Sequence, residues 1–168
     1  MAYADHTTSA KLIVARCAVI TLSDTRTTET DTSGRRITEM LRDAGHVVAH
    51  TTILPDDPAA LETELGTLLG RNDIDCVLTN GGTGISRRDQ TIGVVDRLLD
   101  SPLPGFGELF RMLSWEQIGS GAMLSRATAG VARGKLIFSM PGSTKAVALA
   151  MEKLVLPELR HLLFELRK

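Results

Sequence analysis

The segment that decides the fold runs from Asp73 to Ser101 and reads "DIDCVLTNGGTGISRRDQTIGVVDRLLDS". Its opening stretch, 73–80, is short and largely apolar, which predicts a buried strand. Three glycines within four residues follow and predict a tight turn. From Thr91 onward, apolar residues recur at helical spacing. A strand that leads through a glycine turn into a helix is typical of a parallel α/β sheet.

The same alternation extends along the rest of the chain. We predict further strands at 11–22, 46–54 and, as a hairpin turning near Arg133-Gly134, at 125–140. We predict further helices at 32–45, 58–70, 105–124 with a break near Gly119, 142–155, and 157–166 after a break at Pro157. The predicted class is α/β, a three-layer αβα sandwich whose mostly parallel mixed sheet has one antiparallel strand. Residues 1–10 are expected to form a flexible N-terminal arm, and residues 11–168 a single domain.

Composition excludes several classes of protein. The 168 residues are 43% hydrophobic and carry a net charge of −1, which predicts a globular domain without a broad surface for nucleic acid. Aromatic residues make up only 4%, which argues against a platform for stacking bases. Cys17 and Cys76 lie in apolar runs and are expected to be reduced core thiols. Neither a signal peptide nor a membrane span is evident, so we expect a cytoplasmic protein.

Four polar segments follow predicted strands. They are Ser23-Asp24, Pro55-Asp56, the turn "GGTG" at 81–84, and Pro141-Gly142-Ser143. Ligands of parallel α/β sheets bind at the carboxyl ends of the strands. The sequence therefore predicts one shared site at that edge of the sheet.

The glycine turn allows two interpretations. The residues Gly81, Gly82, Thr83 and Gly84 fit neither of the common phosphate-binding patterns, GxxxxGK[ST] and GxGxxG. They could form a tight turn that merely requires positive φ angles. The neighbouring cations Arg87 and Arg88 favour the second interpretation, a nest of backbone amides that binds phosphate.

Two aspartates are candidate magnesium ligands. Asp89 could cap the helix that starts at Thr91, pair with Arg88, or bind Mg²⁺, and its local sequence does not separate capping from metal binding. Asp57 precedes Pro58 and is expected to be an N-cap, which leaves Asp56 without a structural role. Two carboxylates, Asp56 and Asp89, facing one phosphate loop would suit Mg²⁺.

A second anion pocket is predicted at "SMPGSTKA", residues 139–146. Ser143 can cap the following helix, while Lys145 adds a positive charge beside the open amides. Ser125-Arg126 could contribute similarly, or Arg126 could form a salt bridge on an edge strand. Two anion pockets with Mg²⁺ favour group transfer between phosphorylated molecules over acyl or hydride chemistry.

Seven motifs, in this order and spacing, resemble the molybdenum-cofactor biosynthesis family of MogA/MoaB type, closest to its MoaB branch. They are "TLSDTR" at 21–26, "DTSG" at 31–34, "LPDD" at 54–57, "TNGGTGISRRDQT" at 79–91, "PGFGELFR" at 104–111, "LSRATAG" at 124–130 and "MPGSTKA" at 140–146.

This resemblance implies a molybdopterin adenylyltransferase that uses ATP and Mg²⁺. The family's two functional acidic positions match Asp56 and Asp89, and its nucleotide-binding loop matches the glycine turn at 81–84. Its second turn motif matches Pro141, Gly142 and Ser143, and its "SR" motif includes Ser125; these positions are expected to contact the pterin or a phosphate. Arg87 or Arg88 would stabilise charge on the triphosphate.

The resemblance also implies a homo-oligomer, a trimer or a dimer of trimers. Phe106, Phe110, Leu113 and Trp115 predict a packing face that could belong to such an interface. The alternative to an enzyme is a non-catalytic oligomer of the same pathway that holds molybdopterin or a nucleotide without turnover. A regulator that binds nucleic acid is disfavoured by the charge and the scarce aromatic residues.

Overall fold

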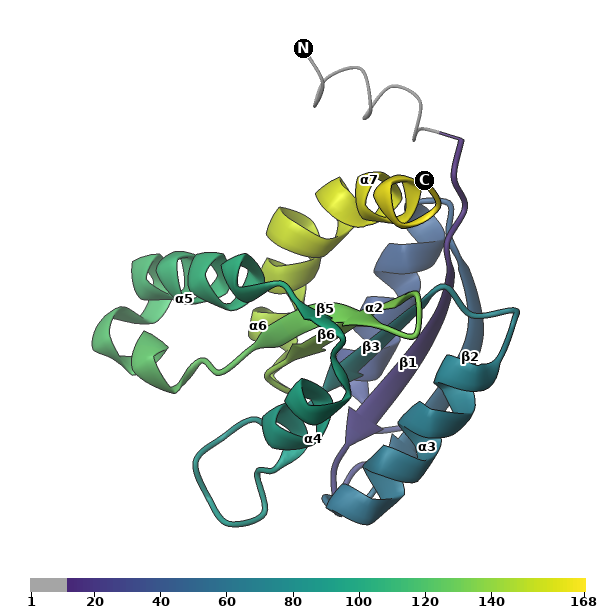
Figure 1. Ribbon diagram of the computed structural model, residues 1–168. Helices are drawn as coiled ribbons and strands as arrows, with labels where there is room; N and C mark the ends of the chain where they lie inside the picture. The colour runs from purple at the N-terminus through teal and green to yellow at the C-terminus, as the bar shows by residue number, and fades with distance from the viewer. Residues whose placement is uncertain (1–11) are drawn as a thin grey trace.

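The computed structural model describes residues 12–168, so the arm predicted at 1–10 lies outside the described residues. A six-stranded sheet in the order β2-β1-β3-β6-β5-β4 crosses the molecule (Figure 1). Its strands are β1 Arg16–Leu22, β2 Val47–Leu54, β3 Cys76–Asn80, β4 Ser101–Pro102, β5 Thr128–Ala132 and β6 Lys135–Met140.

The sheet is mostly parallel, as predicted. β1 pairs in parallel with β2 and β3, and β3 pairs in parallel with β6. The hairpin strand β5 runs antiparallel to both β6 and β4. The two-residue strand β4 was not predicted: the helix expected from Thr91 onward ends at Leu98, and the chain forms this short strand directly after it. Four parallel strands therefore end at one edge of the sheet.

The helices form the two outer layers (Figure 1). They are α2 Thr32–Asp43, α3 Pro58–Gly70, α4 Thr91–Leu98, α5 Pro104–Ile118, α6 Thr144–Ala150 and α7 Leu156–Leu166, with a 3-10 segment at Gly119–Leu124 and a π turn at Met151–Val155. Alternating residues of β1 pack against opposite layers. Ala18 and Ile20 join the core beneath α3 and α4, whereas Cys17 and Val19 join the core beneath α2, α5, α6 and α7. This arrangement confirms the three-layer αβα sandwich.

The predicted core thiols are confirmed. Cys17 and Cys76 are both fully buried and free, and they are direct partners in the pairing of β1 with β3. Burial is the main cause that raises the pKa of Cys76 well above its usual range. Both side chains therefore lie in this core as small apolar groups.

Two helix boundaries were predicted from neighbouring residues alone, one correctly and one wrongly. Asp57 caps α3 as predicted, since its carboxylate accepts the backbone N–H groups of Ala59 at 3.3 Å and Ala60 at 3.2 Å. The predicted break at Pro157 is wrong. Helical structure continues from α6 into α7 through the π turn at Met151–Val155, directly ahead of Pro157. A π turn accommodates the missing N–H of proline without ending the helix.

Across residues 12–168, the helices are too short or too polar to cross a membrane.

Candidate functional site

The glycine turn that follows β3 requires glycine at its first two positions. Gly81 has φ 96° and Gly82 has φ 63°, a region that other residues rarely adopt. A Cβ on Gly81 would collide with the carbonyl oxygen of Leu22, and a Cβ on Gly82 would collide with the Oγ1 of Thr91. Thr83 is buried. The backbone is therefore pressed closely against the ends of β1 and α4.

The two predicted anion-binding turns lie in contact. The Gly81 N–H donates to the carbonyl oxygen of Met140 at 3.1 Å, and a Cβ on Gly142 would lie 3.0 Å from the Cα of Gly81. Beyond this contact, Ser143 caps α6 by accepting the backbone N–H of Ala146 at 3.2 Å. Pro141 is half-buried and Lys145 is exposed. The structure therefore joins the glycine turn and the "MPGSTKA" turn into one surface.

The start of α2 joins the same surface, which sequence reasoning missed. The hydroxyl of Ser33 donates to the carbonyl oxygen of Gly142 at 2.7 Å. The hydroxyls of Thr32 and Thr144 lie 3.1 Å apart. The available signal was the motif "DTSG", whose residues face the second turn only in the folded chain.

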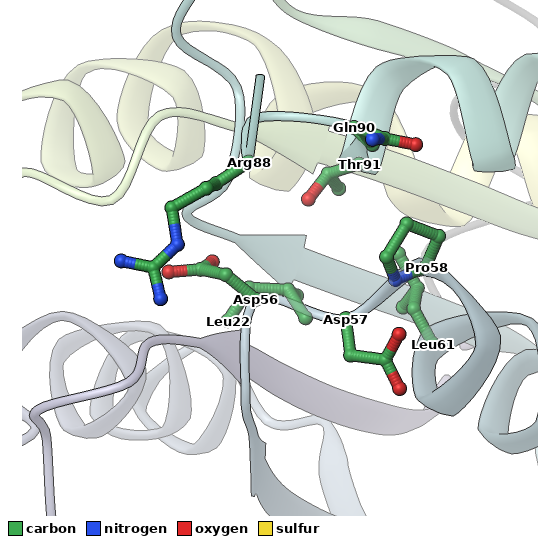
Figure 2. A pocket seen from close by; sticks show the side chains of 8 residues that line it. All are labelled: Leu22, Asp56, Asp57, Pro58, Leu61, Arg88, Gln90 and Thr91. Carbon is green, nitrogen blue, oxygen red and sulfur yellow. The ribbon is translucent and has the colours of Figure 1, made fainter. Parts of the chain in front are cut away.

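Asp56 lies at the end of β2 with an unpaired oxygen. Among the described residues, its Oδ1 is one of two buried side-chain oxygen or nitrogen atoms without a hydrogen-bond partner, and a Cβ on Gly82 would lie 3.3 Å from it. Burial, followed by the charges of Asp24 and Asp89, raises the pKa of Asp56 above its usual value, and Arg88 partly opposes this. Asp56, Arg88 and Thr91 contribute to the lining of one small pocket (Figure 2).

Asp89 has none of the structural roles that its sequence suggested. The N-cap of α4 is Gln90, and the ion pair of Arg88 is made with Asp24. The Oδ2 of Asp89 instead accepts the backbone N–H of Ser86 at 2.9 Å and its hydroxyl at 2.6 Å. The Ser86 hydroxyl is the first cause that lowers the pKa of Asp89. Asp89 is therefore ionised and fixed within the loop.

Arg88 reaches across to the end of β1. Its Nη2 lies 2.6 Å from the Oδ2 of Asp24, and its side chain remains 74% exposed. Figure 2 shows the same side chain extending toward Asp56, with Asp57 turned toward α3. Arg87 is exposed. Asp24 was noted at a strand end in the sequence but was not selected, because nothing local links it to Asp56 or Arg88.

Arg126 connects the segment after α5 to the glycine turn. Its Nη1 donates to the carbonyl oxygen of Gly84 at 2.9 Å. The charge of Arg126 also contributes to the lowered pKa of Asp89. The neighbouring Ser125 is half-buried at the end of the 3-10 segment. The predicted alternative, a salt bridge of Arg126 on an edge strand, is replaced by this bond to the loop.

Asn80 supplies the second buried oxygen without a partner. Its amide nitrogen donates to the carbonyl oxygen of Ile20 at 3.3 Å and to the hydroxyl of Thr21 at 2.9 Å, while its Oδ1 is unpaired. A Cβ on Gly142 would lie 4.0 Å from that oxygen, so the oxygen is close to the contact between the two turns. An unpaired buried acceptor suits a donor group on a ligand.

The donor set can be tested against Mg²⁺. Between residues 12 and 168, no three His, Cys, Asp or Glu side chains are close enough to hold a metal by themselves. Mg²⁺ is commonly bound by one or two carboxylates together with substrate phosphates and water. Asp56 offers a buried oxygen without a partner, and Asp89 lies close enough for its charge to raise the pKa of Asp56. This pair fits Mg²⁺ delivered with a nucleotide and would not suit a permanently caged ion.

The sequence of this chain is similar to those of proteins in one known family. A family model described as "Probable molybdopterin binding domain" matches residues 18–161. "Molybdenum cofactor biosynthesis protein B" of Bacillus cereus is 54% identical over 154 residues, 91% of each chain. The protein of the same name from Bacillus subtilis is 50% identical over 169 residues, covering 100% of this chain and 99% of its own.

Solved structures resemble the whole arrangement. A crystal structure of a molybdenum cofactor biosynthesis protein B has a TM-score of 0.90 and 53% identity, covering 92% of this chain and 97% of its own. The tungsten cofactor synthesizing protein MoaB from Pyrococcus furiosus has a TM-score of 0.83 and 38% identity, covering 92% of this chain and 98% of its own.

Proposed function

This chain belongs to the molybdopterin-binding family of molybdenum cofactor biosynthesis proteins, and from that premise we propose that it is a Mg²⁺- and ATP-dependent molybdopterin adenylyltransferase. In this reaction the terminal phosphate of molybdopterin attacks the α-phosphorus of ATP. A new P–O bond forms, the bond between the α-phosphorus and the bridging oxygen breaks, and pyrophosphate leaves. Adenylyl-molybdopterin is the second product.

One observation carries the proposal: the buried Oδ1 of Asp56 has no partner although it faces the glycine turn. A carboxylate in such a position is unfavourable in the free protein, because burial and two like charges raise its pKa. A cation bound together with phosphates would relieve both effects. Magnesium would neutralise charge on the triphosphate when it is bound there.

The remaining residues would position and neutralise the substrates. The backbone of Gly81, Gly82 and Gly84 would approach the phosphates closely, while Arg87 and Arg88 offer positive charge. The contacting turn at Gly142, with Ser143 and Lys145, would receive the phosphate of molybdopterin. Phosphoryl transfer of this kind depends on alignment and charge, so the protein needs no covalent nucleophile.

The test is direct. The purified protein is incubated with molybdopterin, ATP and Mg²⁺, and adenylyl-molybdopterin and pyrophosphate are measured. We expect both products in equal amounts, and none from Asp56→Asn. Asp57→Asn is the matched control, since Asp57 is an acid one position away that caps α3. A wild-type protein that binds both substrates without forming product would instead be the non-catalytic binding module.

We also propose that the protein is a homo-oligomer, a trimer or a dimer of trimers. Six large apolar side chains are exposed on α5 and the following 3-10 segment: Leu109, Met112, Trp115, Ile118, Met123 and Leu124. A second copy of this chain is the occupant we assign to this face, because patches of this kind commonly form protein interfaces. Phe106 and Phe110, predicted for the same face, are buried. The ring centroid of Phe106 lies 5.2 Å from that of Phe138 in β6 and 6.5 Å from that of Phe110.

A further inference from the structure

Asp24 connects three of the strand-end loops through a single carboxylate. Its Oδ1 accepts the backbone N–H of Asp56 at 3.0 Å, and its Oδ2 lies 2.6 Å from the Nη2 of Arg88. The two partners come from the end of β2 and from the loop that follows β3. Asp24 itself follows β1, so one side chain links the ends of three neighbouring strands.

Asp24 is held firmly enough to act as a support. The backbone N–H of Ser23 donates to the carbonyl oxygen of Leu54 at 2.9 Å. The hydroxyl of Ser23 accepts the backbone N–H groups of Thr25 at 3.2 Å and Arg26 at 3.1 Å. These bonds close a turn around Asp24 and fix its backbone against β2. Only 31% of its side chain is exposed, compared with 74% for Arg88.

We propose that Asp24 is a positioning residue of the adenylyl-transfer site, which orients the Arg88 guanidinium and the Asp56 main chain for the triphosphate. This inference rests on the proposed function. Asp24 is not assigned a contact with either substrate. Its role is to restrict the motion of an exposed arginine, whose rotamer freedom would otherwise have to be lost at each turnover.

The charge of Asp24 and its contact with Arg88 should affect different quantities, the binding of Mg²⁺-ATP and the rate of the reaction, which makes the proposal testable. Removing the negative charge of Asp24 would by itself strengthen the binding of a polyanion. Removing its hold on Arg88 would misalign the cation during the reaction. A salt bridge without a positioning role would leave kcat unchanged, whatever the loss of its charge does to the binding of Mg²⁺-ATP. The expected signature is a lower kcat without a weaker Kd for Mg²⁺-ATP.

Asp24→Asn removes the ion pair with Arg88; it also removes a charge that raises the pKa of Asp56, and this second effect remains in the Arg88→Ala background. Asparagine has the same shape but only one acceptor oxygen. If that oxygen still accepts the Asp56 N–H, the amide nitrogen of the asparagine faces the Arg88 guanidinium, and two hydrogen-bond donors oppose each other. Asp73→Asn is the matched control: Asp73 pairs with Arg71 at 2.7 Å, and this pair lies after the carboxyl end of α3, whereas the site adjoins the start of that helix.

The experiment measures kcat and the Kd for Mg²⁺-ATP in the wild type, Asp24→Asn, Arg88→Ala, the double variant and Asp73→Asn. We expect Asp24→Asn to lower kcat about tenfold with Kd unchanged or smaller. The loss should disappear in the Arg88→Ala background, because the two side chains act as one unit. Asp73→Asn should behave as the wild type. An unchanged kcat in Asp24→Asn, or a full tenfold loss that persists without Arg88, overturns the inference.

A second measurement separates this inference from the proposed reaction. The side-chain motion of Arg88 is followed by NMR relaxation in the free protein, with and without Asp24→Asn. We expect the side chain to be ordered in the wild type and flexible in the variant. Equal mobility in both proteins overturns the positioning role. A wild type that forms no product overturns the proposed reaction, and the NMR comparison then still decides whether Asp24 orders Arg88.

Discussion

Gly142 lies directly against Gly81, so that a Cβ at position 142 would stand 3.0 Å from the Cα of Gly81 and 3.3 Å from its nitrogen. The obstacle is backbone, which cannot rotate away as a side chain can. Two loops that would each bind an anion are thus held in direct backbone contact. This contact sets the distance between the proposed nucleotide and molybdopterin sites.

Gly142→Ala should force the two turns apart. We expect a loss of about 1–3 kcal/mol in the free energy of unfolding, as for other overpacked sites. We also expect the rate of adenylyl transfer to fall about tenfold, because a shift of a few tenths of an ångström between the turns disturbs the alignment of the two substrates. Urea denaturation and turnover measure the two effects. Gly66→Ala in α3 is the control: it has open space, and should stabilise the protein by about 0.5–1 kcal/mol with unchanged turnover.

Asp56→Asn should abolish activity while stabilising the fold. The pKa of Asp56 is raised, so its stabilising contribution is fully present below the usual value of 3.8 and is lost as the pH rises through the raised pKa. At pH 7 the ionised carboxylate is therefore unfavourable in the free protein. The variant should unfold at a higher temperature at pH 7 and form no measurable adenylyl-molybdopterin. A variant that is both active and less stable would contradict this assignment.

Asp89→Asn should have the opposite effect on stability. The pKa of Asp89 is lowered, so its contribution is present above the usual value of 3.8 and is lost as the pH falls through the lowered pKa. We expect the variant to be about 1 kcal/mol less stable than the wild type at pH 7, where the ionised acceptor of Ser86 is lost. The difference should shrink as the pH is lowered through that range. Turnover at the wild-type rate would exclude Asp89 as a magnesium ligand.

Trp115→Glu should dissociate the oligomer. Trp115 is 61% exposed in the centre of the apolar face of α5, and a buried carboxylate in an interface is strongly unfavourable. Sedimentation velocity should show a shift toward monomer. Thr67→Glu places the same charge on an exposed position of α3 in the other helix layer, and should leave the assembly intact. Identical sedimentation of the two variants would exclude this face as the interface.

Sequence reasoning succeeded where the deciding interaction is local. The cap formed by Asp57 depends on amide groups two and three residues away, and it was predicted correctly. The glycine turn and the alternation of strands and helices are also local patterns. Pro157 shows the limit of this approach, because the surrounding core retains the helix through a π turn.

What the sequence by itself determined is therefore the order of the elements, the parallel sheet and the edge at which polar loops gather. Only the tertiary structure decided how those loops meet: Asp24 accepts the backbone N–H of Asp56, Arg88 pairs with Asp24 and not with Asp89, and Gly142 lies against Gly81. The physical reason is how far apart the interacting residues lie along the chain. Helix caps and turns are formed by neighbours along the chain, whereas the pairing of Asp24 with Asp56 spans 32 residues and exists only because β1 and β2 lie side by side.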